Sequence, residues 1–399
     1  MKRTNRRGRA GAAWLRLCVA GGAALFGVAG TFDAPFVAAQ DRGPEAAARP
    51  DRGGRWNARW NGDAAPGGWG RRGGPAPNGQ GGQPGGQGGQ NGERNRENER
   101  VPLEQALERA EPTKPTRLNQ SEFTTQDGVR LVCNYYKGGG NADAPAAILL
   151  HGRDGKKEDF DPLAKFLAEQ GCAVIVPDLR GCGESVRRAV NDMSRGPRGM
   201  MQAREYSMKN FTNDDLRSMI EYDKEVWFGF LVYLHNKELL NAKKTILVGA
   251  ELGAALAAAW ARDDWNGKGD AAQNVVGLAL LSPDASNDEG KFNALTSLEA
   301  YRKKAKGKNS GFVVFVGQMT EDKFEDAKKI QKKIGGKADE ELPPEEKVAP
   351  IVALKTEKQG VALLTVESFG VSKTVAEFVA NRMNALPKKR QKWEEIKVD

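Results

Sequence analysis

The sequence contains very little histidine, the side chain on which much hydrolytic catalysis depends. Only His151 and His235 occur among its 399 residues, and imidazole is the commonest base that takes a proton from an attacking hydroxyl. No cluster of histidine, cysteine and carboxylate residues has the spacing of metal ligands, and the glycines at 138–140 lack the strand-to-helix context of a phosphate loop. We therefore expect neither a metal nor another cofactor.

Long hydrophobic runs are also scarce. One apolar stretch, residues 17–28, follows a basic head and precedes small residues that end at Ala38 and Ala39. It is shorter than the roughly 20 residues that a membrane-spanning helix needs, and this order of segments is typical of a secretory signal. Residues 1–39 are predicted to be a signal peptide, with an uncleaved anchor as the alternative. The mature chain would then be exported to the periplasm, cell envelope or exterior, with no transmembrane span.

Cysteine is rare, with four in the chain. Cys18 lies in the predicted signal peptide, which leaves Cys133, Cys172 and Cys182 in the mature chain. Three thiols cannot all pair, and the strand-like run between Cys172 and Cys182 would hold those two too far apart for a bond. Buried free thiols are expected.

The net charge of +9 suggests nucleic-acid binding until its distribution is considered. Residues 1–118 contain 19 of the 61 Lys and Arg residues and 11 of the 52 Asp and Glu residues. The rest of the chain contains 42 Lys and Arg and 41 Asp and Glu. The later part is therefore nearly neutral and lacks the basic footprint of a nucleic-acid-binding domain. No nucleic-acid partner is expected.

Residues 40–118 are dominated by Gly, Pro, Gln, Asn and Arg, apart from a short helical segment at 103–110. Such a composition buries too little apolar surface to offset the entropy of ordering, so a disordered linker is predicted. Trp56, Trp60 and Trp69 lie among arginines in this region. They could stack on a carbohydrate or envelope polymer, or they could be remnants of a drifting linker.

Residues 119–388 alternate between strand-like and helix-like runs, which predicts parallel strands joined by helical crossovers. Residues 389–399 are expected to be a charged tail. The expected strands are residues 129–136, 146–150, 173–177, 245–248, 275–281, 312–316 and 361–366. The expected helices are residues 160–170, 216–234, 254–261, 321–334 and 375–386.

Three motifs stand where these strands end: His151-Gly152, the run Asp-Leu-Arg-Gly-Cys-Gly-Glu-Ser at 178–185, and Gly-Ala-Glu-Leu-Gly at 249–253. In this order the chain from about 120 to 386 resembles the α/β-hydrolase superfamily, most of all its dienelactone-hydrolase and esterase-like members. The resemblance implies an α/β fold, a three-layer sandwich around a mostly parallel sheet. It also implies that His151 and Gly152 belong to an oxyanion loop.

The third motif is similar to a nucleophile elbow, a sharp turn from strand to helix. Gly249 and Gly253 would remove side chains that otherwise collide at the turn, and the amide of Leu252 would face the oxyanion. The residue at the apex is Glu251 where the family has a serine. Because a helix N-terminus favours an anion, we expect the amides of the turn to hold the carboxylate and to lower its pKa. The alternative is that apolar neighbours such as Phe369 desolvate the carboxylate and raise its pKa.

The resemblance also implies a histidine, usually followed by glycine, in the loop after the last strand, and the matching position here is Phe369. Asp322, or less well Glu321, matches the position of the acid. Without a histidine to orient, Asp322 is better interpreted as a carboxylate at a helix N-terminus. His151 could approach the pocket as an alternative base, whereas His235 is expected to be a surface or hydrogen-bonded histidine.

The loss of both nucleophile and base favours an exported, non-catalytic relative, a pseudoenzyme that binds an unknown ligand or an envelope component or acts as a scaffold. The alternative is a residual or atypical ester hydrolase that uses Glu251. The long segment 185–212, rich in methionine and arginine, could be a lid, a partner surface or a loose excursion. Residues 335–350 are expected to be a solvated linker.

Overall fold

The computed structural model describes residues 101–191, 201–268, 272–285, 294–302, 311–336, 341–343 and 347–397. The predicted signal peptide and most of the predicted linker lie outside these residues, as do Met193 and Met200. None of the described helices is long and apolar enough to cross a membrane.

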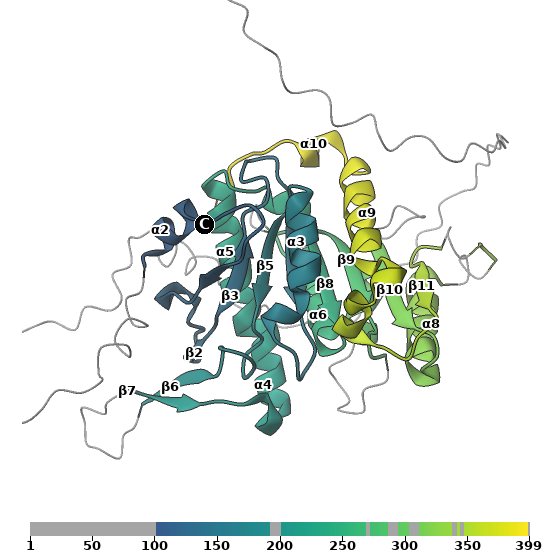
Figure 1. Ribbon diagram of the computed structural model, residues 1–399, viewed down its shortest axis with the longest axis horizontal. Coiled ribbons are helices and arrows are strands. Elements are labelled where there is room, and N and C mark those ends of the chain that lie inside the picture. The colour runs from purple at the N-terminus through teal and green to yellow at the C-terminus, as the bar shows by residue number, and fades with distance from the viewer. Residues whose placement is uncertain are drawn as a thin grey trace, which may run out of the picture. The chain divides into compact units, whose positions relative to one another are not determined.

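The core is an eight-stranded sheet in the order β1-β3-β5-β4-β8-β9-β10-β11, drawn in Figure 1. Its strands are β1 Thr116–Leu118, β3 Cys133–Tyr136, β4 Ala146–Leu150, β5 Ala173–Pro177, β8 Thr245–Ala250, β9 Val275–Leu281, β10 Phe312–Gly317 and β11 Ile351–Leu354. The pairs β1·β3 and β3·β5 are antiparallel, and every later pair is parallel. The predicted, mostly parallel sheet is confirmed.

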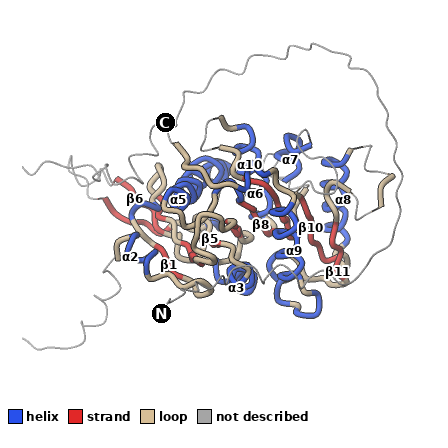
Figure 2. The backbone as a smooth tube through the Cα atoms, turned by 90° about the horizontal axis from the view of Figure 1, so that it is seen from above, coloured by secondary structure: helices blue, strands red, loops and turns tan. Residues whose placement is uncertain are grey.

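Helices cover both faces of this sheet, as Figure 2 shows for α3 on one side and α5 and α6 on the other. They are α3 Asp161–Glu169, α5 Lys224–Asn236, α6 Leu252–Asn266, α7 Ala294–Arg302, α8 Glu321–Gly335 and α9 Val371–Asn384. Along β4, Ala146, Ile148 and Leu150 join the apolar cluster under α5 and α6, while Ala147 and Leu149 join the one under α3 and α9. Because a strand buried on both faces must be apolar throughout, the run at 146–150 forms the centre of a three-layer sandwich.

The predicted last strand, residues 361–366, is wrong. That segment is the 3-10 helix η11 Gly360–Thr365, and the last strand of the sheet is β11, which pairs with β10. Leu363 and Leu364 are buried, so the apolar run that suggested a strand packs as a helical turn instead. A short apolar run does not distinguish these two outcomes by periodicity.

The predicted strand at 129–136 is divided between two sheets. Its first part, β2 Val129–Arg130, pairs with β6 Arg187–Asn191, and β6 pairs with β7 Met201–Glu205. The segment 185–212 is therefore built around an antiparallel hairpin, with Met208 buried after it. The hairpin leads into α4 Asn213–Ser218 and a π-helix, η7 Met219–Asp223.

The folded part of the chain extends beyond residues 119–388 at both ends. Before it, α2 Leu103–Glu108 and β1 contribute buried Leu103, Leu107 and Leu118. After it, α10 Lys388–Gln391 is followed by Ile396, which is 2% exposed. Residues 348 and 349 of the expected linker are also buried. As expected, Cys133, Cys172 and Cys182 are buried free thiols.

Candidate functional site

The turn from β8 into α6 has the strained geometry of an elbow. Glu251 has φ 51° and ψ −113°, a left-handed conformation that is costly for a residue with a side chain. A Cβ on Gly249 would lie 2.2 Å from the carbonyl oxygen of Gly253, and a Cβ on Gly253 would lie 2.0 Å from that of Leu150. Both positions therefore require glycine. The Glu251 amide donates to the carbonyl of Leu281 at 3.0 Å, which fixes the apex to β9.

The side chain of Glu251 lies between two glycines from different loops. A Cβ on Gly152 would be 2.3 Å from Oε2, and a Cβ on Gly360 would be 2.9 Å from the carboxyl carbon. Gly152 follows β4 and Gly360 follows β11, so the carboxylate fills the space where these loops meet the elbow. No amide at the start of α6 bonds to it as a cap.

The electrostatic environment of Glu251 does not match the sequence-based expectation. Burial raises its pKa; of the charged neighbours, Lys323 acts to lower it, while Asp284 and Asp154 raise it further. Lys323 is itself ion-paired with Asp284, which weakens its effect. The prediction that the amides of the turn lower this pKa is therefore wrong in direction, because the carboxylate accepts no cap hydrogen bond from them and desolvation disfavours its charged form.

His151 is a structural residue in this site. It is fully buried, its Nε2 accepts the amide proton of Leu179 at 3.0 Å, and its Nδ1 lies 2.7 Å from the carbonyl oxygen of Gly152. Since Nε2 accepts, Nδ1 carries the proton and donates. Burial lowers the pKa of the ring. Both nitrogens are occupied by backbone, so His151 holds the loop at Gly152 in place and offers no lone pair to a substrate.

His235 is equally occupied and lies elsewhere in the fold, at the end of α5. Its Nδ1 accepts the amide proton of Ala242 at 3.2 Å, and its Nε2 donates to the carbonyl of Glu394 at 2.8 Å. This is the hydrogen-bonded histidine that the sequence predicted, and it is fully buried.

The loop after the last strand brings Gln359 and Gly360 to the elbow. Gln359 Nε2 donates to the carbonyl of Gly317 at 2.8 Å, and its Oε1 accepts from Ser282 Oγ at 2.6 Å. The Gly360 amide donates to the same hydroxyl at 2.9 Å. Ser282 directly follows β9 and has φ 48°, so this network ties together the ends of β9 and β10 and the loop after β11.

The prediction for Phe369 is corrected accordingly. Phe369 ends the 3-10 helix η12 Glu367–Phe369 and packs, half-buried, on the apolar cluster under α3 and α9. The error follows from the misplaced last strand. A glutamine-glycine pair just after the apolar run 351–354 was the available signal for the true loop.

Asp322 lies in the first turn of α8 and is exposed. This is the position of a helix N-terminal carboxylate, where it complements the helix dipole. The acidic groups near Glu251 are instead Asp284, which follows β9, and Asp154, and the sequence indicated neither of them. Within the described residues, no group of three or more His, Cys, Asp or Glu could hold a metal ion.

The run at 178–185 supports the site through buried charges. The Asp178 carboxylate accepts hydrogen bonds from the backbone amide and from the Nζ of Lys157, both at 2.8 Å. Ser185 Oγ donates to the backbone carbonyl of Asp178 at 2.9 Å. Lys157 also pairs with Glu184 at 2.8 Å. Buried charges persist where they are paired and hydrogen-bonded, so these residues fix the loops beside the elbow.

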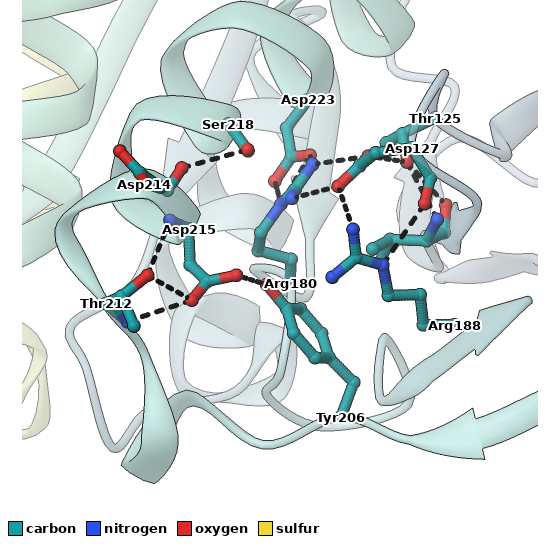
Figure 3. Close-up of polar contacts among 11 residues, drawn as sticks. Thr125, Asp127, Arg180, Arg188, Tyr206, Thr212, Asp214, Asp215, Ser218 and Asp223 are labelled. Carbon is teal, nitrogen blue, oxygen red and sulfur yellow. Dashed lines mark hydrogen bonds and ion pairs between the residues drawn. The ribbon is translucent and has the colours of Figure 1, made fainter. Parts of the chain in front are cut away.

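Arg180 forms a second buried cluster, shown in Figure 3. Its Nε donates to both carboxylate oxygens of Asp223, at 2.9 and 3.0 Å, and its Nη1 donates to Asp127 at 2.9 Å. Asp127 also pairs with Arg188 at 3.5 Å, and Tyr206 donates to Asp215. The cluster joins the turn before β2, the hairpin and the π-helix to the loop after β5.

The parallel sheet, the strained strand-to-helix turn and the flanking loops together define an α/β-hydrolase architecture. Residues 145–321 match the family model described as the alpha/beta hydrolase fold, from β4 through the elbow to the start of α8. This part of the chain has the α/β-hydrolase fold.

Solved structures with a similar arrangement include hydrolases of several organisms. A dienelactone hydrolase from Anabaena variabilis is 14% identical with a TM-score of 0.41, covering 67% of this chain and 97% of its own. An esterase of Pyrococcus furiosus is 16% identical with a TM-score of 0.42, and the match covers 67% of this chain and 92% of the esterase. The esterase domain of a Rhodothermus marinus protein is 13% identical with a TM-score of 0.42, and the match covers 67% of this chain and 99% of that domain. Among curated proteins, none matches the chain.

Proposed function

We propose that this protein is an exported, non-hydrolytic binding protein built on the α/β-hydrolase fold. The observation that carries the proposal is the position of Glu251, whose carboxylate fills the space between Gly152 and Gly360. In a serine hydrolase of this fold that space serves the nucleophile and the oxyanion. An anion already located there repels the negative charge that develops on a carbonyl oxygen during acyl transfer.

The hydrogen bonds of both histidines support the same proposal. Acyl transfer by a hydroxyl needs a base whose free lone pair accepts the proton. His151 and His235 use both ring nitrogens on backbone groups, and Gln359 in the loop after the last strand carries an amide that does not accept protons at neutral pH. Among the described residues, the elbow therefore has neither a serine at its apex nor a histidine with a free lone pair beside it, which supports a non-hydrolytic role.

The remaining catalytic candidate is attack on carbon by the Glu251 carboxylate, which the retained strain at the apex favours. A carboxylate whose pKa is raised by burial is more nucleophilic when charged. On an ester it would attack the acyl carbon and expel the alkoxide, and the mixed anhydride so formed needs a water for its hydrolysis. No histidine among the described residues is free to activate that water, so the anhydride would accumulate after one turnover unless Asp284 or Asp154 beside Glu251 serves as the base. Intact-mass measurement after exposure to short esters separates this reaction from the binding role, which leaves the mass unchanged.

The main test is labelling of the purified full-length protein with a fluorophosphonate probe, together with turnover of short p-nitrophenyl esters. We expect neither in the wild type. Glu251→Ser alone should gain little, because a serine without a base is a poor nucleophile. Glu251→Ser with Gln359→His should label faster than Glu251→Ser with Phe369→His. The residue next to Gln359, Gly360, lies against the Glu251 side chain, whereas Phe369 packs on the apolar cluster under α3 and α9. Labelling or turnover in the wild type that disappears in Glu251→Ala would refute the proposal.

A further inference from the structure

The end of the sheet opposite the elbow is covered by basic residues. The 3-10 helix η8 Ala242–Lys244 leads into the start of β8, and Glu251 follows the end of that six-residue strand. At about 3.3 Å a residue, η8 and Glu251 lie roughly 20 Å apart along β8. The helix α10, at the top of Figure 1, reaches the same end as η8, because Arg390 donates to the carbonyl of Gln273 just before β9 at 2.7 Å.

Two stretches form this surface, residues 237–244 and residues 382–397, and we call them together the basic end. They contain nine Lys and Arg and three Asp and Glu. Residues 119–399 contain 42 and 41 of these, so the remainder of that part of the chain has 33 and 38. The basic end therefore has a formal charge of +6, against −5 for the remainder.

Neighbouring acidic groups offset only part of this charge. Glu104 of α2 pairs with Lys237 at 3.4 Å, and Asp143 pairs with Lys244 at 3.8 Å. Asp264 also lies near this end but is buried. The charge that remains toward the solvent is mainly that of three exposed lysines in and just after α10. These C-terminal lysines are Lys388, Lys389 and Lys392.

The kind of cation favours an extended anionic surface over a single phosphate group. Arginine recognises phosphate through its planar fork, but both arginines of the basic end donate to backbone carbonyls, Arg382 to Val276 at 2.6 Å and Arg390 to Gln273. The C-terminal lysines are point charges on flexible stems and need no fixed geometry. Trp393 follows them and is half-buried, and tryptophan is enriched where an amphipathic ring meets the headgroups of a membrane.

The chain that precedes the described residues joins the domain at this same end. The helix α2 is held at the C-cap of α5 by the ion pair of Glu104 with Lys237. Residues 1–100, which include the basic head and the apolar stretch at 17–28, are therefore attached near the basic end and not at the elbow. Contact of that stretch with a bilayer would raise the effective concentration of the basic end at the same bilayer.

We propose that the basic end is an electrostatic docking surface for an anionic phospholipid bilayer, with Glu251 and the elbow facing away from it. Each lysine brought to an anionic membrane strengthens binding by about 5-fold, and the attraction falls off within a Debye length. The three C-terminal lysines should together contribute roughly 100-fold. The site at the elbow is then left uncovered by the bilayer.

Acetylation of lysines in the full-length protein, read residue by residue by mass spectrometry, tests this orientation. Vesicles that contain phosphatidylglycerol should protect the C-terminal lysines, whereas vesicles of phosphatidylcholine alone should not. Raising the salt concentration from about 0.1 to about 1 M shortens the Debye length from about 10 to about 3 Å and should remove the protection. Three exposed lysines near the elbow should react equally in every condition: Lys355, Lys358 and Lys373.

A triple variant measures the contribution of the C-terminal lysines to binding. Lys388→Gln with Lys389→Gln and Lys392→Gln should weaken the binding of phosphatidylglycerol vesicles by roughly 100-fold in a flotation assay. Binding to phosphatidylcholine vesicles is subtracted, because the apolar stretch at 17–28 can enter either kind of vesicle. All three side chains are exposed, so the variant should fold as the wild type does.

The matched control removes the same charge near the elbow. Lys355→Gln with Lys358→Gln and Lys373→Gln should leave vesicle binding unchanged. Equal binding by the two triple variants would overturn the proposal, since net charge or another segment would then account for the attraction. Equal acetylation of the C-terminal lysines with and without anionic vesicles would overturn it as well. Stronger protection of these lysines by duplex DNA than by the vesicles would assign the basic end to nucleic acid instead.

Discussion

At Glu251, the backbone conformation and the burial of the side chain act in the same direction on stability. A left-handed φ costs a residue with a Cβ about 1–2 kcal/mol, and burial of the carboxylate without a cap adds a desolvation penalty. Gly249 and Gly253 allow the turn, and Gly152 and Gly360 leave room for the side chain. A position that lowers stability in two ways is typical of a functional site, which agrees with the proposed binding role.

Replacement of Glu251 by glutamine should stabilise the protein at neutral pH. The folded pKa of Glu251 is raised above the unfolded value, so the native state loses stability as pH rises through the interval between the two values. Above that interval the glutamine variant should be more stable by roughly 1 kcal/mol for each unit of raised pKa. Below about pH 4 the difference should vanish, because the carboxyl is protonated in both states.

Urea unfolding of wild type and variant between about pH 4 and 8 measures this difference, a range that brackets the glutamate reference value. Glu367→Gln, an exposed glutamate in η12, is the control and should have no effect at any pH. A glutamine variant less stable than wild type at pH 7 would mean that the amides of the turn hold the charge after all.

At the scale of the elements, the loop after β11 is fitted to the elbow side chain. Gly360 and Gly370 have nearly the same φ, 55° and 56°, but a Cβ on Gly370 meets nothing within 4 Å. Alanine at either position should cost about 1 kcal/mol from backbone strain. Gly360→Ala should cost a further ~1–3 kcal/mol, because its methyl group overlaps the Glu251 carboxyl.

A double-mutant cycle isolates this overlap. In a Glu251→Ala background the extra cost of Gly360→Ala should disappear, while the cost of Gly370→Ala stays the same. Equal costs of the two glycine substitutions in the wild type would show that the elbow and this loop are not in contact. The measurement is the free energy of unfolding in urea.

The hairpin and the π-helix depend on Arg180, and the Asp223 side chain should be the most sensitive point. Asp223→Asn leaves the buried Arg180 guanidinium without the charge of one carboxylate partner. This should lower the free energy of unfolding by about 3 kcal/mol, the lower end of the range for breaking a buried ion pair. Asp214→Asn is the control, since its carboxylate is 87% exposed and pairs with Arg217 on the same helix. It should change the free energy of unfolding by less than about 0.5 kcal/mol. Similar effects of the two substitutions would show that the cluster does not stabilise the fold.

The sequence predicted those elements whose pattern is local. The buried run 146–150, the strand-turn-helix unit at 245–261 and the helix at 321–334 have the period and the glycines that their geometry requires. The loop at Gln359 was missed because residues 351–354 and 361–366 are equally apolar, and the pairing of β11 with β10 is a contact that no local pattern encodes. The direction of the Glu251 pKa was missed for a similar reason, since it depends on Gly152, Asp284 and Gly360 from three other segments.

At the scale of the whole molecule, both ends of the described chain contact α5. The segment before residue 119 does so at the C-cap of α5, where Glu104 pairs with Lys237 at 3.4 Å. Residues 392–397 do so through Asn236 and His235. Composition placed the start of the domain at residue 119, because Leu103, Leu107 and Leu118 are spread among polar residues. Their burial shows that this stretch belongs to the domain, and only tertiary contacts reveal it.

Removal of that stretch should therefore destabilise the domain. A fragment of residues 119–399 lacks α2 and β1, and with them three leucines whose exposed fractions are 7%, 5% and 0%. Each buried leucine contributes about 2 kcal/mol as an upper value, so the fragment should be less stable than one of residues 101–399 by roughly 3–6 kcal/mol. Loss of β1 also leaves β3 as an unpaired edge, which favours aggregation.

Urea unfolding of the two fragments, with light scattering to follow association, measures both effects. Leu103→Ala with Leu107→Ala in the longer fragment should reproduce part of the loss while leaving β1 in place. Equal stability of the two fragments would mean that the domain begins at residue 119, where composition alone places it.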